Sequence, residues 1–567
     1  MIRIQISRQL ALIIASLVAI TFYKFWLADV YSLRAIYAPQ DDYLFINLAR
    51  NILDGNWLGE YNQYTLMKGL FYPLWIAFIN LFEIPLLTAQ QLLYALSCTI
   101  FLLAINPHVK NKWWLILIYA FLIFNPFSIG VDRVLRLGIY PSLTILVFTC
   151  AYGLYSRSIS ARSSSIWWAV GLGISLAAFW HTREERIWIM PSLAMLLGVG
   201  LLHAIYKYKT KAVGFVLIYM TPVVIVYSST LSLSYINWKH YGIFTPLEIG
   251  TEEFKSAYSG LLRIRTETFI RHYPVTHETI NKASNVSPAF REIKPALLAK
   301  SGEYPSLNFG MRASHFIWTL RDSVQASGYY NFEHAIDPKD IPETLDLYKR
   351  IGHEIHTACD SGKLDCATLL NPFFPQWRME DNAQILPTLN QTVTRLVTWG
   401  GFDYKVNDMR SEPFYPETNM LETLLLFRSV TNESLRPHRR NAANYLPEFE
   451  QDRIHVKRKT VRNIWRNFYQ RLSPVFFIVF SILIIFRFIY EVISRRLQTM
   501  TTFSVALLGG ILSHSLIMTL IQINAFTEVL RRSQFTVYPV LIMFIVTGFI
   551  VSNEAIRLYR TNNKDKD

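Results

Sequence analysis

The stretch SPVFFIVFSILIIFRFIY, residues 473–490, decides the class of fold of this chain. It consists mostly of Phe, Ile, Leu and Val, and Arg487 is its one charged residue. A membrane hydrocarbon core of roughly 30 Å is crossed by about 20 apolar residues of helix. We therefore predict a membrane span here, with Arg487 close enough to its end for the long side chain to reach the lipid headgroups.

Apolar runs of similar length recur along the rest of the chain. The 567 residues are 51% hydrophobic and 17% charged, which is too apolar for an ordinary soluble protein. The sequence predicts a mainly α fold: a polytopic α-helical membrane protein with about 10–11 transmembrane helices. The other predicted spans cover residues 9–28, 86–105, 113–127, 138–155, 166–180, 187–206, 212–234, 503–525 and 535–553.

The apolar run 70–82 is short for a span, and Pro73 and Pro85 bound it. If this run dips into the outer face and returns, the basic loops between the other spans all fall on the cytoplasmic side, where Lys and Arg are preferred. If it crosses, another short segment must be miscounted. We prefer the first alternative, which places both termini in the cytoplasm. The first apolar run lacks a small-residue cleavage site, so we predict no cleaved signal peptide.

This topology divides the chain into three parts. Residues 1–234 form an N-terminal transmembrane module with a first outer loop at 29–85, and 235–472 form a mostly helical extracytoplasmic domain. Residues 473–567 form the last spans and a short cytoplasmic tail. The basic segment 453–472 either lies on the bilayer surface or is a solvated connecting helix. We expect a multi-pass protein of the bacterial inner membrane with this domain facing the periplasm or exterior.

The cysteines of the outer domain, Cys359 and Cys366, flank a turn that contains glycine. An oxidising compartment would permit a disulfide between them, which we favour over free thiols or a zinc site. The net charge of +15 follows from the basic loops that membrane insertion favours, so we expect no nucleic-acid partner. The spans carry few ionisable residues, which argues against an ion-coupled transporter.

Three short outer loops carry arginines against the positive-inside trend. They are VDRVLRLG (131–138), HTREERIW (181–188) and EVLRRSQFTVYP (528–539). Guanidinium groups bind phosphate oxygens through paired, charge-assisted hydrogen bonds, so a shared anionic site would offset this cost. For any single arginine, local ion pairing or contact with lipid phosphates is an equally good explanation.

The first outer loop contains YAPQDDYLFINLARNILDGNWLG, residues 37–59. The spacing of its apolar residues predicts a helix over 41–53, with Asp41 as its N-cap and Asp54-Gly55 at its end. One cap residue suffices, so Asp42 is a surplus carboxylate. Near a membrane surface it could act as a general base toward an acceptor, or hold a divalent cation such as Mg²⁺ or Mn²⁺ together with Asp41.

These features resemble the GT-C superfamily of integral-membrane glycosyltransferases, which includes protein O-mannosyltransferases and the bacterial aminoarabinose transferase. The matching stretches are APQDDYLFINLARNIL (38–53), KGLFYPLWIAFINLF (68–82) and RRSQFTVYP (531–539), within a multi-span body that has a large outer domain. The resemblance covers roughly 1–245 and 470–555, and it gives no family for residues 246–470.

The resemblance implies a cell-envelope enzyme that transfers a sugar from a polyprenyl phosphate or diphosphate to an outer protein, glycan or lipid acceptor. Its base would be Asp42 or Asp41. The donor phosphate would be held by Arg133, Arg136, Arg183, Arg186, Arg531 and Arg532. The acceptor side of the site would be lined by Lys68, Tyr72, His181 and Glu184. The alternatives are a transporter or flippase for lipid-linked sugars, and a non-enzymatic membrane anchor for the outer domain.

Overall fold

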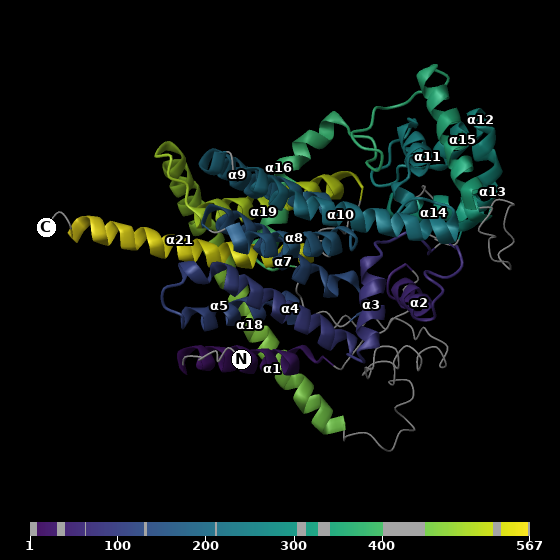
Figure 1. Ribbon diagram of the computed structural model, residues 1–567. Coiled ribbons are helices and arrows are strands. Elements are labelled where there is room, and N and C mark those ends of the chain that lie inside the picture. Colours follow the sequence, from purple (N-terminus) through teal and green to yellow (C-terminus); the bar gives the residue numbers. More distant parts are fainter. Residues whose placement is uncertain are drawn as a thin grey trace.

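The computed structural model in Figure 1 is a mainly α-helical, polytopic membrane protein with a helical domain at one end of the membrane bundle. It describes residues 8–30, 40–62, 64–129, 133–160, 162–209, 212–302, 313–326, 341–400, 448–525 and 534–564. Within these residues, seven helices are long and apolar enough to cross a membrane, and three shorter apolar helices cover Phe71–Leu81, Trp114–Ile123 and Ser164–Trp180.

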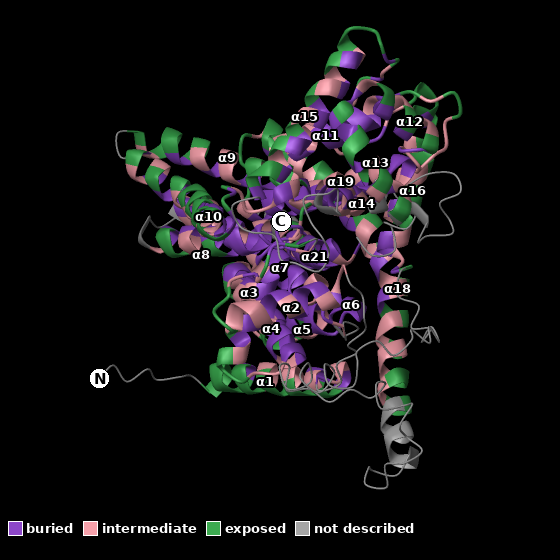
Figure 2. Cartoon of the chain, turned by 90° about the vertical axis from the view of Figure 1, so that its right-hand side faces the viewer, coloured by how far each residue is buried: buried purple, intermediate pink, exposed green. Residues whose placement is uncertain are grey.

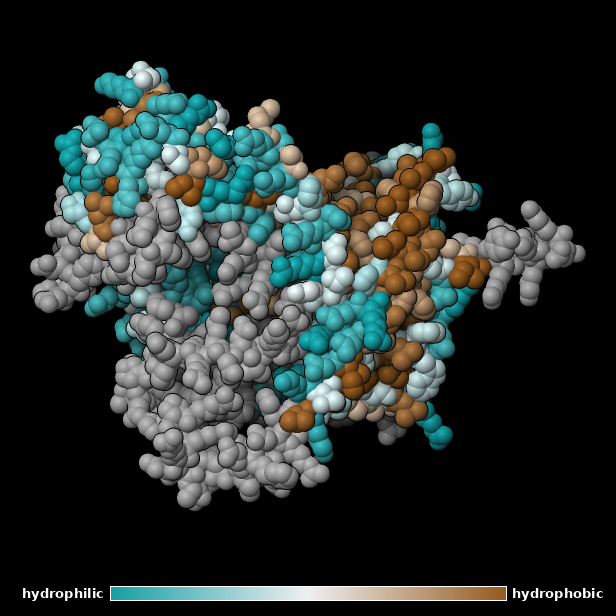
Figure 3. Space-filling model, turned by 180° about the vertical axis from the view of Figure 1, so that it is seen from behind, coloured by the Kyte–Doolittle hydropathy of each residue, from teal (hydrophilic) through white to brown (hydrophobic). Residues whose placement is uncertain are grey.

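A helix occupies each of the predicted spans. The bundle helices are α1 (Arg8–Ala28), α4 (Leu86–Ile105), α5 (Trp114–Ile123), α7 (Tyr140–Ser160), α8 (Arg162–Trp180), α9 (Met190–Tyr208), α10 (Ala212–Tyr241), α18 (Glu448–Ile493), α19 (Thr499–Asn524) and α21 (Tyr538–Lys564). Figure 3 shows a band of hydrophobic side chains over one flank of this bundle, whereas the outer domain is mostly hydrophilic. That contrast is expected where lipid replaces water as the solvent.

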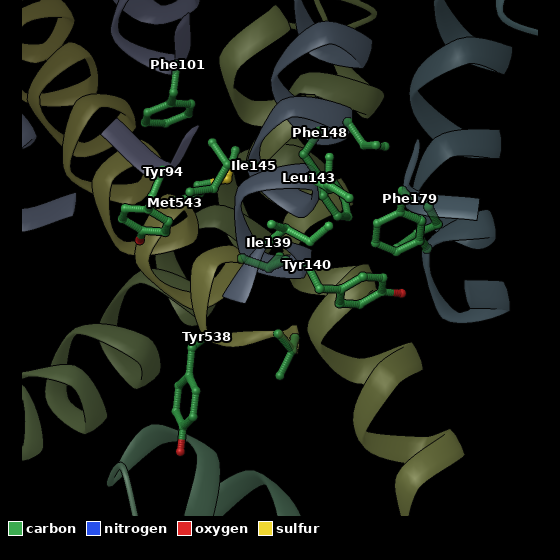
Figure 4. Close-up of a cluster of buried hydrophobic side chains, with 14 of the residues drawn as sticks. Tyr94, Phe101, Ile139, Tyr140, Leu143, Ile145, Phe148, Phe179, Tyr538 and Met543 are labelled. Atoms are coloured by element: carbon green, nitrogen blue, oxygen red, sulfur yellow. The ribbon is translucent and has the colours of Figure 1, made fainter. Parts of the chain in front are cut away.

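Helix α7 packs against α4, α8, α9 and α21, and its side chains form much of the bundle core. In Figure 4 the ring of Tyr140 lies beside that of Phe179, and their centroids are 4.4 Å apart. Ile145 and Phe148 are fully buried in the same cluster. Because protein surrounds α7, its side chains need not be as apolar as those of the lipid-facing helices.

Two predicted domain boundaries fall inside continuous helices. Helix α10 continues past residue 234, and α18 joins the basic segment 453–472 to the span 473–490. Helix α16 (Asn382–Val397), which the sequence assigned to the outer domain, packs on α19 and α18. Just after it, Trp399 is buried and stacks on Tyr538 of α21 at 4.2 Å, so this segment belongs to the core of the bundle.

The first outer loop forms two short helices, α2 (Asp42–Leu53) and α3 (Phe71–Leu81). Eleven residues of helix span about 16 Å, which is too short for the hydrocarbon core. Figure 1 shows α3 beside α2, lying across the end of the bundle that is farther from the C-terminus of α21. This arrangement agrees with the prediction that 70–82 does not cross.

The outer domain has a hydrophobic core of its own, formed by α11 (Glu252–Arg263), α12 (His277–Val286), α13 (Pro288–Gly302), α14 (Ala313–Ala326) and α15 (Ile341–Asp360). Helix α11 lies along α15, and Phe254 packs on Tyr348 between them. Cys359 and Cys366 form a disulfide that closes the turn after α15, which confirms the predicted pairing.

Candidate functional site

Asp41 precedes α2, but its side chain does not cap the helix. It occupies the N-cap position and its carbonyl accepts a hydrogen bond from the Phe45 N–H at 3.1 Å, yet the carboxylate makes no capping bond. The capping role expected of Asp41 is therefore wrong, and the carboxylate is engaged elsewhere. The predicted end of the helix is confirmed, because Asp54 is the C-cap and Gly55 adopts a φ of +79°.

Asp42 is fully buried and faces the 133–136 loop. Arg133 Nη2 lies 2.5 Å from its Oδ2, and the Val134 N–H donates to its Oδ1 at 3.2 Å. Burial raises the pKa of Asp42 to about 6, although Arg133 and Val134 act in the opposite direction. The carboxyl is thus held by a guanidinium, a group that also binds phosphate, and its raised pKa suits a general base.

Asp41 pairs with Lys68, whose ammonium lies 2.5 Å from Oδ1 and also donates to the Gln40 carbonyl. Burial acts to raise the pKa of Asp41, but Lys68, Arg136 and Arg133 together outweigh it, so the pKa is lowered and the carboxylate stays ionised. Two aromatic rings face the ammonium: Phe45 at 5.3 Å and Trp318 at 5.8 Å. Trp318 comes from α14 of the outer domain, and no sequence signal pointed to it.

A third ion pair joins two of the arginine-containing loops. Arg136 Nη1 contacts the Glu184 carboxylate at 2.7 and 2.9 Å and donates to the Thr182 carbonyl at 2.9 Å. The Gly69 N–H donates to Glu184 at 3.3 Å, and a Cβ at this glycine would come within 2.3 Å of the His181 carbonyl. The first outer loop is therefore packed directly on 181–184, at a position where only glycine fits without movement.

The three pairs form one cluster around the ring of Phe45, which faces both Lys68 and Arg136. Phe45 also packs edge-on against Tyr72 at 5.1 Å. Three cations and three carboxylates thus balance each other at the outer end of the bundle. An added anion would compete with these carboxylates for the same cations.

Other predicted site residues lie beside the cluster but point elsewhere. Arg183 pairs with Glu185, and Arg186 donates to the Trp180 carbonyl at 2.8 Å and stacks on the Trp180 ring. This is the local pairing that the sequence left open as an alternative. Arg531 and Arg532 lie outside the described residues.

His181 and Tyr72 are buried and hydrogen-bonded. The His181 ring contacts Ser229 at 3.1 Å, and the Tyr72 hydroxyl accepts from Gln90 at 3.1 Å. Burial, assisted by Arg186, lowers the pKa of His181 to about 4, so this ring is neutral at physiological pH. Both side chains support the cluster. Burial and, after it, the nearby charge of Asp42 raise the pKa of Tyr72.

A buried ion pair within the outer domain is hydrogen-bonded to the first outer loop. Arg321 of α14 and Glu248 are both fully buried, 2.6 Å apart. Arg321 also donates to the carbonyls of Asn62 and Thr65, and Glu248 accepts from the Tyr61 hydroxyl. The chain that leads from α2 to Lys68 is thereby fixed against the domain that supplies Trp318.

A groove of about 1180 Å³ runs along the outward face of α2. Its polar lining includes Asn47, Arg50, Asn51, Asp54, Glu60 and His240. By helical spacing, Asp41 lies on the same face as Leu44, Leu48 and Asn51, at the end of the groove nearest the cluster. The lining of the groove begins at Leu44, one helical turn after Asp41, and includes neither carboxylate of the cluster.

The fit of a divalent cation can be judged from the available ligands. Within the described residues, no group of three or more His, Cys, Asp or Glu side chains is arranged to hold a metal ion. Asp41 and Asp42 each already hold a protein cation. A metal at these carboxylates would have to displace Lys68 or Arg133.

Comparison with known proteins adds no assignment, because no protein-family model, curated protein or solved structure matches this chain.

Proposed function

We propose that the chain is a membrane glycosyltransferase of the GT-C type, which moves a sugar from a polyprenyl phosphate or diphosphate to an acceptor on the outer face. The observation that carries this proposal is the buried pair of Asp42 and Arg133 within the charged cluster at the outer end of the bundle. A titratable carboxylate held by a phosphate-binding side chain supplies both a base and an anion site.

The pair suggests how the donor would activate the base. A donor phosphate would compete with Asp42 for Arg133 and release the carboxylate. Asp42 would then accept the proton of an acceptor hydroxyl or amine while that atom attacks the anomeric carbon of the sugar. The bond from this carbon to the phosphate oxygen breaks, and the lipid phosphate leaves with its charge held by Arg133 and Arg136.

The groove along α2 is the proposed path of the acceptor. Its lining begins at Leu44, one helical turn after Asp41. Asp41 is fixed by Lys68, so in this scheme the neighbouring Asp42 takes the proton. Trp318 and Phe45 flank the ammonium of Lys68 and keep it on Asp41. Asp41 and Lys68 are in this scheme positioning residues.

The proposal is tested by Asp42→Asn in a transfer assay with a labelled polyprenyl-phosphate sugar in detergent. Loss of general-base catalysis should lower kcat by about 10²–10⁴-fold. Asp346→Asn, at an exposed position of α15 in the outer domain, is the matched control and should keep full activity. Retention of transfer by the Asp42 variant would refute the role of this residue.

The same assay separates the transporter and anchor alternatives. Detergent abolishes any gradient and any second compartment, so label that moves from lipid to acceptor reports transfer alone. A flippase or a membrane anchor for the outer domain would give no labelled acceptor with the wild-type chain.

A further inference from the structure

The outer half of α18 carries cations on its lipid-facing side. One exposed stripe runs along the helix with the spacing of a single face. Its members are Lys457, Ile464, Phe468, Arg471, Val475, Ile482, Phe486 and Ile489. From Val475 onward the stripe is the apolar surface of a membrane span, and in Figure 2 α18 stands at the edge of the bundle. Lys457 and Arg471 therefore continue a surface that faces lipid.

Contacts at the two ends of α18 define its depth. Near its start, Arg458 pairs with Asp29 at 2.8 Å and Arg462 donates to the Leu27 carbonyl at 2.8 Å. Both partners lie at the outer end of the first span. Near its other end, Arg487 donates to the carbonyl of Val551, close to the cytoplasmic end of α21. Between these contacts the helix runs about 38 Å, so it crosses the membrane at a tilt.

This depth places the two cations of the stripe differently. Lys457 directly precedes Arg458, the first residue that contacts the end of α1, and so lies at the level of the headgroups. Arg471 lies roughly 14 Å along the helix inside them, where a guanidinium exposed to lipid is costly unless it reaches a phosphate. Within the described residues neither side chain has an acidic partner, whereas Arg458 and Arg462 on the opposite side are bound to α1.

We propose that this stripe binds the phosphate headgroups of anionic phospholipids in the outer leaflet. Ile464 and Phe468 lie between the cations and fit acyl chains. The cations are fourteen residues apart, about 21 Å along the helix, so they hold two separate headgroups and cannot grip one lipid diphosphate. Basic residues on the outer side oppose the insertion preference, and the bound phosphates offset that cost.

The test uses the full chain in nanodiscs of phosphatidylcholine and phosphatidylglycerol. After mild detergent extraction, native mass spectrometry measures the enrichment of retained phosphatidylglycerol over phosphatidylcholine. We expect enrichment of phosphatidylglycerol with the wild-type chain. In the double variant Lys457→Gln/Arg471→Gln, each substitution should lower this enrichment by about fivefold. Lys349→Gln/Lys363→Gln removes the same charge from exposed positions of the outer domain and should leave the enrichment unchanged.

A conservative variant guards against misfolding. Lys457→Arg/Arg471→Lys keeps both charges and should keep the enrichment, whatever the stability of the glutamine variant. The proposal is overturned if the glutamine and control variants retain phosphatidylglycerol equally, or if the wild-type chain retains both phospholipids without preference. Displacement of phosphatidylglycerol by polyprenyl phosphate at equal mole fraction would also overturn it, because the stripe would then serve the donor.

Discussion

The buried pair of Arg321 and Glu248 should be a main determinant of how firmly the outer domain is held to the first outer loop. The perturbation we consider is Arg321→Met, which keeps most of the side-chain volume and removes the charge. It leaves Glu248 buried with only the hydroxyls of Tyr61 and Tyr348 as donors. It also removes donors from two backbone carbonyls.

The magnitude follows from the burial of both partners, which are fully inaccessible to solvent. Removing one member of such a pair costs about 3–5 kcal/mol, because the other charge stays buried without compensation. Glu248→Met should cost a similar amount. The double variant leaves no unpaired charge and loses only the neutral hydrogen bonds, so it should cost about 2–3 kcal/mol. The two single effects should therefore exceed the double effect by several kcal/mol.

The assay is denaturant unfolding of the purified chain in detergent micelles, followed by tryptophan fluorescence. Arg350 and Glu292 form a pair that is 41% and 42% exposed, and the same methionine cycle there should show coupling below about 1 kcal/mol. Additive single effects at Arg321 and Glu248, or a coupling as small as that of the control, would refute the reasoning.

Three further predictions concern acidity, the disulfide and metal dependence. Because the pKa of Asp42 is raised to about 6, kcat/KM of transfer should fall as the pH drops below about 6. Arg133→Gln removes a charge that lowers this pKa, so the fall in kcat/KM should move to higher pH. An unchanged pH profile in this variant would contradict the assignment of Asp42 as the base. Cys359→Ser/Cys366→Ser opens a loop with a sequence separation of 7 and should destabilise the outer domain by about 2.5 kcal/mol in urea unfolding, whereas Cys98→Ser leaves the bridge intact. Transfer activity should persist in EDTA, because Lys68 and Arg133 already neutralise Asp41 and Asp42. Activity that is lost in EDTA and restored by Mg²⁺ or Mn²⁺ would contradict this prediction and show that a metal ion displaces Lys68 or Arg133.

The helix of the first outer loop shows how far local patterns reach. Its length and its buried residues Leu44, Phe45 and Leu48 follow from apolar spacing, and Gly55 ends it as expected. The role of Asp41 did not follow, since a residue that suits a cap can instead meet a distant lysine. Sequence reasoning treats each terminus alone, whereas Lys68 reaches Asp41 only when the loop folds back.

The domain boundaries show a second difference. The sequence placed 382–399 in the outer domain together with the rest of 235–472. In the structure Leu396, Val397 and Trp399 are buried against the ends of the last spans. A segment that does not cross the membrane can still pack its apolar residues against the membrane helices. The position at which it packs depends on the tertiary arrangement of those helices.

By itself the sequence determined the membrane class and the positions of the apolar helices, and it predicted that the charged loops meet at one end of the bundle. The reason is that lipid offers no partners to backbone polar groups, so apolar run length and basic loops leave few alternatives. Only the tertiary structure decided which charges pair. Asp42 with Arg133, Asp41 with Lys68 and Arg136 with Glu184 are far apart along the chain. Their distances are set by how α2, α3 and the outer loops pack together, and no local pattern contains that information.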